Sequence, residues 1–191
     1  MKKMFFGAMI ASFLFACSNG TKKDDTTTAV SDSATTQNSS TDQKSPAKME
    51  LLGDELNAGA TASWDAFSKG DIDGFVANFD ENIRVNFSGG DSLVGKKAVV
   101  DYYKGRWKII DSISFSDVIT LPVKSNEMPG SVPTGKWMLT WRKTDVKYKN
   151  GKKLTFWVHN ANHYNDASKV DYIAQYIDFK PIMDATKGMM K

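Results

Sequence analysis

The sequence has few of the residues from which common metal and catalytic sites are built. It contains one cysteine among 191 residues, so neither an internal disulfide nor a cysteine zinc cluster can form. Its two histidines, His159 and His163, fall two ligands short of a metal site. An extended strand would also hold them about 13 Å apart. We therefore expect neither a metal nor a cofactor.

The sequence also lacks an excess of charge of one sign. It has 25 Lys and Arg against 22 Asp and Glu, which leaves a formal charge of +3. The positive residues are scattered among the negative ones, so we expect no nucleic-acid partner. It has no glycine-rich phosphate loop, no nucleotide fingerprint and no Ser-His-Asp order.

The N-terminus has the pattern of an export signal. Two lysines precede a mostly apolar stretch, residues 4–16, which is too short to span a bilayer and is typical of a signal peptide. The stretch ends Leu14-Phe15-Ala16-Cys17, which resembles the lipobox of bacterial lipoproteins. In that class the cysteine is lipidated and becomes the mature N-terminus. The resemblance implies a signal peptide over residues 1–16 and membrane attachment through Cys17.

The residues after Cys17 predict a flexible tether. Residues 18–47 contain six Ser, seven Thr and no aromatic residue, so they cannot bury enough apolar surface to offset the entropy of ordering. We expect a disordered tether over residues 17–47 and a folded domain over residues 48–191. In some bacteria an aspartate after the lipidated cysteine directs retention in the inner membrane, but Ser18 occupies that position here. We therefore expect the protein in the bacterial cell envelope, at the outer membrane, on its periplasmic or surface face.

Hydrophobic periodicity in residues 48–191 predicts helices first and strands afterwards. Apolar residues at helical spacing predict helices over 49–69 and 96–110, with a short helix between them that Asp71 caps. Because helices precede and interrupt the strands, the fold class is α+β and not a simple β sandwich. Alternating patterns predict strands over 83–87, 113–121, 136–148, 153–164 and 169–179, with a loop over 122–133.

This order resembles the SnoaL-like branch of the nuclear-transport-factor-2-like superfamily. The similar segments are Trp64-Asp65-Ala66-Phe67-Ser68-Lys69-Gly70-Asp71 and Gln175-Tyr176-Ile177-Asp178, and the resemblance covers roughly residues 50–185. It implies a cone-shaped, curved antiparallel sheet wrapped on three helices of the N-terminal half. A small-molecule pocket often lies at the mouth of such a cone. The superfamily includes cyclases, isomerases, hydrolases and non-catalytic binding modules, so the fold alone does not choose the function.

Strand pairing predicts which face of the sheet lines the cone. A two-residue turn at Asn150-Gly151 would place Trp141 opposite Asn160. One face is then apolar with a few amides, and we expect it to face inward; a one-residue bulge would exchange the two faces. The expected inner face carries Trp137, Leu139, Trp141, Phe156, Val158, Asn160, Asn162, Tyr164, Ile173, Gln175 and Ile177. The expected outer face carries Thr140, Arg142, Trp157, His159, His163, Tyr172, Tyr176 and Asp178.

We expect aromatic and amide side chains to line a pocket for a small apolar ligand, although Trp64 at helical spacing also fits an ordinary core. The expected lining residues are Trp64, Tyr103, Trp107, Trp141, Asn160, Asn162, Tyr164 and Gln175. The leading hypothesis is therefore a lipid-anchored, extracytoplasmic small-molecule-binding module. The aromatic and polar outer face of the sheet is typical of an interface, which predicts a homodimer.

Two alternatives stay open. The first is a cyclase, isomerase or hydrolase in which Asp178 or His159 acts as a general base. Asp178 is similar in position to the acid/base aspartate of SnoaL-type cyclases. Asn160 is similar in position to the oxyanion-hole aspartate of ketosteroid isomerase, but an amide does not titrate. The second alternative is a non-catalytic protein-interaction domain in which large side chains fill the cone.

Overall fold

The computed structural model describes residues 47–189. The expected signal peptide, Cys17 and most of the expected tether lie outside these described residues. In chain order the elements are β1 (Met49–Leu51), η1 (Asp54–Leu56), α1 (Asn57–Ser68), α2 (Ile72–Phe75), β2 (Phe79–Phe87), β3 (Ser92–Val94), α3 (Lys96–Trp107), β4 (Ile110–Ser125), β5 (Gly135–Tyr148), β6 (Lys153–Tyr164), β7 (Val170–Tyr176) and α4 (Phe179–Thr186).

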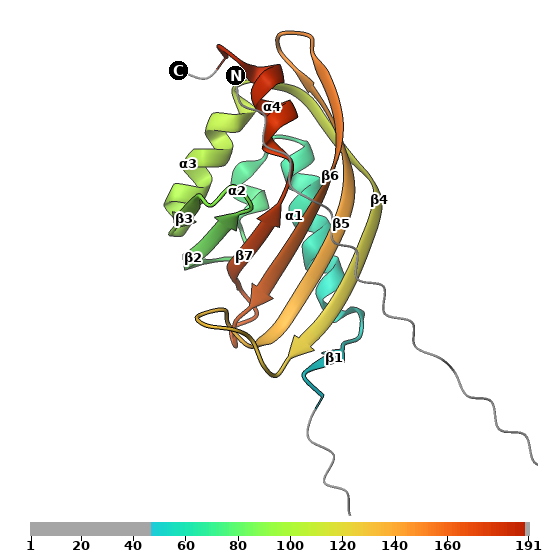
Figure 1. Ribbon diagram of the computed structural model, residues 1–191, viewed down its shortest axis with the longest axis vertical. Helices are drawn as coiled ribbons and strands as arrows, with labels where there is room; N and C mark the ends of the chain where they lie inside the picture. Colours follow the sequence, from blue (N-terminus) through green and yellow to red (C-terminus); the bar gives the residue numbers. More distant parts are fainter. Residues whose placement is uncertain (1–46, 190–191) are drawn as a thin grey trace, which may run out of the picture. The chain divides into compact units, whose positions relative to one another are not determined.

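The strands form one curved sheet in the order β1-β4-β5-β6-β7-β2-β3. The helices α1, α2 and α3 lie on its concave side, and α4 lies across one end (Figure 1). The expected fold class, an α+β cone with a curved sheet wrapped on three helices, is confirmed. One detail differs from a purely antiparallel sheet: β2 runs parallel to β7, with Val85 paired to Ile173.

Local sequence explains how the first helices begin and end. Gly70 follows α1 with a φ of 77°, a left-handed conformation that favours glycine and stops the helix. The Asp71 carboxylate then accepts a hydrogen bond from the Gly74 N–H at 2.8 Å and caps α2, as the sequence predicts. The chain therefore turns sharply between α1 and α2.

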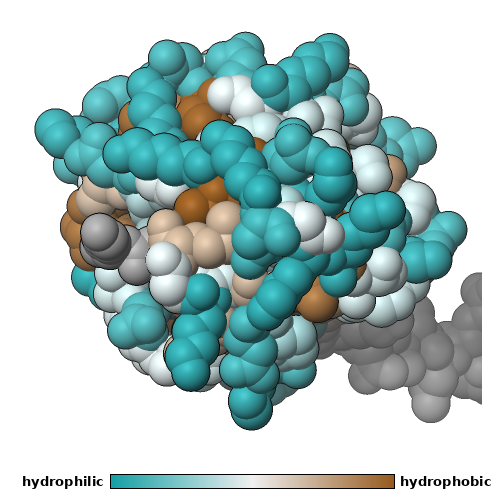
Figure 2. Space-filling model, turned by 90° about the horizontal axis from the view of Figure 1, so that it is seen from above, coloured by the Kyte–Doolittle hydropathy of each residue, from teal (hydrophilic) through white to brown (hydrophobic). Residues whose placement is uncertain are grey.

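The main core lies between the helices and the concave face of the sheet. Aromatic side chains dominate it: Phe67 and Phe75 stack edge to face at 4.9 Å, and Tyr103 of α3 contacts both. A second cluster lies at the α4 end, where Ile182 packs with Val146. Figure 2 shows that end from above, with hydrophilic side chains over most of the surface and apolar ones between them.

The connection between β5 and β6 is one residue longer than expected. Three residues, 149–151, form the loop, and the Tyr148 N–H donates a hydrogen bond to the Lys152 carbonyl oxygen at 2.9 Å. Gly151 has a φ of 83°, the left-handed conformation that ends a three-residue hairpin loop. The strands consequently pair one residue out of step with a two-residue turn.

This difference exchanges the two faces of β5 relative to β6, because side chains alternate along a strand. Trp141 pairs with His159 on the outer face, and Thr140 pairs with Asn160 on the inner face. The expectation that Trp137, Leu139 and Trp141 face the interior is therefore wrong. The inner face of β5 carries Met138, Thr140, Arg142, Thr144 and Val146.

The residues of β6 and β7 keep the face that was expected for them. Their pairing places Asn160 opposite Gln175 in place of Ile173, a shift of two residues that preserves alternation. Other boundaries differ from expectation. The helix expected over 49–69 begins only at Asn57, because residues 49–51 form the strand β1, and the strand β3 was not expected. The strand β4 continues through Pro122 to Ser125, and a final helix, α4, follows where a strand was expected to end.

Candidate functional site

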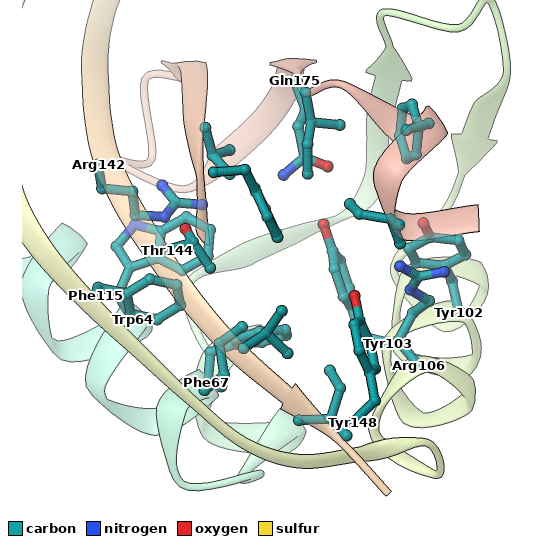
Figure 3. Close-up of a pocket in the computed structure, with 18 residues that line it drawn as sticks. Trp64, Phe67, Tyr102, Tyr103, Arg106, Phe115, Arg142, Thr144, Tyr148 and Gln175 are labelled. Atoms are coloured by element: carbon teal, nitrogen blue, oxygen red, sulfur yellow. The ribbon is translucent and has the colours of Figure 1, made fainter. Parts of the chain in front are cut away.

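The sheet, α1, α3 and α4 line a partly open cavity of about 80 Å³ (Figure 3). Ile182 lines it from α4, and Tyr102 and Tyr103 reach it from α3. Most of the wall is aromatic or aliphatic. The lining residues are Trp64, Phe67, Tyr102, Tyr103, Arg106, Ile110, Ile113, Phe115, Arg142, Thr144, Val146, Tyr148, Phe156, Val158, Gln175, Ile177, Phe179 and Ile182.

Arg142 brings a cation into this wall from the middle of β5, with 2% of its surface exposed. Its guanidinium carbon lies 3.3 Å from the centroid of the Trp64 ring and 5.2 Å from that of Phe115. Aromatic faces stabilise a cation but accept none of its in-plane N–H groups. The buried Nε and Nη1 of Arg142 have no hydrogen-bond partner within residues 47–189.

Three neutral polar groups share the wall with Arg142. The buried Thr144 hydroxyl, two residues along the same strand, makes no hydrogen bond to the part of the chain that the structure describes. The side chains of Tyr103 and Gln175 hydrogen-bond to each other. Figure 3 shows the polar ends of Arg142, Thr144, Tyr103 and Gln175 directed toward the same space.

The charge of the cavity is positive. Arg106 and Arg142 line it, and no aspartate, glutamate or histidine of residues 47–189 does. Desolvation lowers the pKa of Arg142 to about 9, so the group stays charged at neutral pH. Burial raises the pKa of Tyr103, which keeps its hydroxyl protonated. The polar groups of this wall can therefore donate hydrogen bonds to a ligand.

The expected amide residues lie beside a smaller cavity of about 20 Å³. Asn160, Asn162 and Tyr164 line this space on the other side of Trp64 and Tyr103. Its volume matches one water molecule, for which roughly 10–15 Å³ suffices. Of the amides expected in the pocket, only Gln175 reaches the larger cavity.

The structure separates the aromatic residues that were expected to line the pocket. Trp64 and Tyr103 do line the larger cavity. Trp107 packs against Gly70 and Phe67 and is absent from the cavity wall. Trp141 lies on the outer face of the sheet, because the β5–β6 loop has three residues. The expectation that Trp141 lines the pocket is therefore wrong.

The candidate catalytic residues lie outside the cavity. Asp178 is exposed and caps α4, where its carboxylate accepts a hydrogen bond from the Lys180 N–H at 3.0 Å. His159 lies on the outer face, stacked between Trp141 at 4.5 Å and Tyr176 at 5.5 Å. The enzymatic alternative therefore has neither of its expected bases in the cavity.

His163 is also on the outer face, and it is committed to structural contacts. Its Nδ1 lies 2.5 Å from the Asp171 carboxylate and its Nε2 lies 2.8 Å from the Thr134 carbonyl oxygen. Both ring nitrogens are therefore occupied, and His163 fastens the segment before β5 to β7. Within residues 47–189 no cluster of three or more His, Cys, Asp or Glu could hold a metal ion.

The lining residues that sequence reasoning missed include Arg142, Thr144, Arg106, Phe67 and Phe115. Arg142 and Thr144 were missed because aromatic and polar residues alternate along β5, so that one face of the strand carries large aromatic side chains and the other carries polar ones. That pattern normally indicates an aromatic inner face. The available signal was Lys149 before Asn150-Gly151, since a glycine in the third position suits a three-residue hairpin loop.

No model of a protein family and no curated protein matches the sequence. Solved structures do. A candidate polyketide cyclase from Silicibacter sp. superposes with a TM-score of 0.57 at 14% identity, covering 71% of this chain and 98% of that one. An NTF2-like protein of unknown function from Burkholderia pseudomallei gives 0.55 at 14% identity, covering 72% and 100%.

A third similar structure is a protein with a ketosteroid isomerase-like fold from Catenulispora acidiphila, solved in complex with trimethylamine. It gives a TM-score of 0.51 at 8% identity, covering 66% of this chain and 90% of that one. At such low identities these likenesses show the fold alone, which is the curved-sheet fold of NTF2-like and SnoaL-like proteins. Among the described residues, no helix is long and apolar enough to cross a membrane.

Proposed function

From the premise of an NTF2-like fold, we propose that this chain is a small-molecule-binding module whose ligand occupies the cavity beside Arg142. One observation carries the proposal. The cavity has unpartnered hydrogen-bond donors and an apolar wall, but within residues 47–189 no carboxylate or imidazole lines it. Such a wall can hold and orient a ligand, whereas general acid–base catalysis needs a titrating group within reach of the substrate.

The test is to fill the cavity. Val158 is 4% exposed and lines it, so Val158→Phe should occupy the space that the ligand needs. We expect calorimetric titration of the full chain with butanoate and with butanamide to show binding by at least one of them. Val158→Phe should abolish that binding.

The matched control is Val94→Phe, at a position on β3 that is 60% exposed and away from the cavity. It should leave binding unchanged. Equal binding by wild type and Val158→Phe, with both variants folded by circular dichroism, would place the ligand elsewhere and contradict the proposal. Absence of binding by both compounds would contradict it as well.

We further propose that the module is lipid-anchored through Cys17 in the bacterial cell envelope, at the outer membrane. The lipobox-like segment ending at Cys17 and the Ser/Thr-rich residues 18–47 support this location. In a bacterial host that carries the lipoprotein machinery, palmitate should label the chain and place it in the membrane fraction. Cys17→Ala should lose both properties. Palmitate labelling that survives Cys17→Ala would contradict the anchor.

We also propose that the chain forms a homodimer through the outer face of the sheet. Apolar side chains are exposed there on three strands, including Ile119 at 57%, Trp157 at 53% and Tyr176 at 54%. Exposed apolar and aromatic side chains on one face are typical of protein interfaces.

A further inference from the structure

Arg142 is a buried cation whose hydrogen-bonding donors have no acceptor in the part of the chain that the structure describes. It is 2% exposed, and the Trp64 and Phe115 rings lie against its guanidinium, with Tyr103 also near enough to interact electrostatically. A charge in this position is costly unless it is paired and hydrogen-bonded. The acceptors that its Nε and Nη1 lack must therefore come from outside residues 47–189.

Within residues 47–189, no carboxylate forms an ion pair with Arg142. The chain has three arginines, and two of them, Arg106 and Arg142, line the same cavity. Asp65 lines a neighbouring space of about 180 Å³ beside Arg142 but is exposed and makes no ion pair with it. The phenol of Tyr103 is neutral at physiological pH, because burial raises its pKa.

We propose that the ligand of this cavity is a short-chain apolar monocarboxylate whose carboxylate pairs with the Arg142 guanidinium. The proposal rests on the binding function proposed above and names the chemical class of its ligand. A planar guanidinium presents N–H groups in a fork that matches the two oxygens of a carboxylate. The unpartnered Thr144 hydroxyl supplies a further donor beside it.

The rest of the cavity selects the body of the ligand. Ile113, Phe156, Val158 and Ile177 form an aliphatic and aromatic wall, which suits a hydrocarbon chain. The volume of about 80 Å³ suits a chain of a few carbons. A phosphate would set further charged oxygens against apolar side chains, so a monocarboxylate fits this wall better than a dianion.

The test compares three compounds on the full chain by calorimetry: butanoate, its neutral isostere butanamide, and inorganic phosphate. Butanoate should bind about tenfold or more tightly than butanamide, because a charge-assisted hydrogen bond is stronger than a neutral one. Phosphate should bind more weakly than butanoate. Arg142→Met should lower the butanoate affinity about tenfold or more, to that of butanamide.

A matched control removes a different arginine. Arg84 is exposed on β2 and away from the cavity, so Arg84→Met makes the same chemical change and should leave butanoate affinity within about twofold. Arg142→Lys keeps the charge without the fork, and it should bind butanoate more weakly than wild type and more tightly than Arg142→Met. Thermal unfolding verifies that each variant is folded.

The outcomes separate the two proposals. Butanamide binding as tightly as butanoate, or Arg142→Met retaining wild-type affinity for butanoate, would overturn the carboxylate inference and leave cavity binding intact. Phosphate binding more tightly than butanoate would also overturn it. No binding by either four-carbon compound would overturn both the inference and the binding function. If Arg142→Met does not fold, Arg142→Lys with unchanged butanoate affinity would overturn the inference.

Discussion

The buried charge of Arg142 destabilises the folded domain when no ligand is bound. Its guanidinium is removed from water, and no residue among 47–189 forms an ion pair with it. The Trp64 ring at 3.3 Å offsets part of the cost, since a desolvated cation–π contact contributes about 2 kcal/mol. Removing a buried ion from water costs several kcal/mol, so the net effect of the charge is unfavourable.

Arg142→Met should therefore raise the free energy of unfolding by about 1–4 kcal/mol in the absence of ligand. The measurement is urea unfolding of the full chain at neutral pH. Arg84→Met, at an exposed position, should change stability by less than about 0.5 kcal/mol. A destabilised Arg142→Met would show that the aromatic contacts outweigh the desolvation of the charge.

The same residue predicts a dependence on pH. Desolvation lowers the pKa of Arg142 in the folded chain to about 9, below its ordinary value of 12.5. Above pH 9 the unfolded chain therefore holds more protons at this group than the folded chain, so the wild type gains stability relative to Arg142→Met as pH rises. The difference in stability between the two should be constant from pH 6 to 8 and should narrow above about pH 9. A constant difference through pH 10.5 would contradict this assignment.

At the scale of elements, the three-residue loop after β5 determines which side chains face the cavity. Gly151 closes the loop at a φ of 83°, and the register it sets pairs Lys143 with Trp157 outside and Thr144 with Phe156 inside. Had the loop been one residue shorter, Arg142 would face outward. The lining of the cavity thus depends on a connection that lies outside it.

The helix α4 is a second element that shapes the site. Its residues Phe179 and Ile182 line the cavity, and Ile182 is 2% exposed. The Asp178 carboxylate caps this helix, which explains an aspartate at this position without any catalytic role.

Asp178→Ala should lower the free energy of unfolding by about 1 kcal/mol, because the first N–H groups of α4 lose their acceptor. Asp178→Asn and Asp178→Ser should restore most of that loss, since both side chains cap helices well. Thermal or urea unfolding of the full chain measures the effect. Wild-type stability of Asp178→Ala would show that the cap contributes nothing.

At the scale of the whole molecule, the outer face of the sheet is the surface most suited to self-association. Ile119, Leu121, Trp157 and Tyr176 are exposed on it, and Trp141, His159 and Tyr176 stack there. Burying these side chains against a second copy would remove a large apolar area from water.

Light scattering of the full chain in detergent should give twice the protein mass at high concentration. Trp157→Glu should reduce it to a single copy, because the change places a charge in the interface. The matched control is Met183→Glu on α4, which alters an equally exposed apolar residue at 66% exposure away from the sheet. A wild-type chain that stays monomeric at high concentration would contradict the dimer.

Local patterns in the sequence were sufficient to predict much of the fold. Helical spacing placed α1 and α3, Asp71 and Gly70 marked the boundary between α1 and α2, and alternation located β5 and β6. These features depend on neighbouring residues, through caps, turns and periodic burial, so they can be read from a single chain. The α+β class follows from their order.

The set of residues that line the cavity depends on the tertiary structure. Phe67, Arg106, Phe115, Arg142 and Gln175 come from distant parts of the chain, and the sheet register brings them together. The position of Arg142 illustrates the reason: an alternating strand has two chemically plausible faces, and pairing across a loop chooses between them. Periodicity in the sequence predicted the order of helices and strands, and the family resemblance implied that the sheet is curved. Only the folded pairing decided that a cation, and not Trp141, faces the cavity.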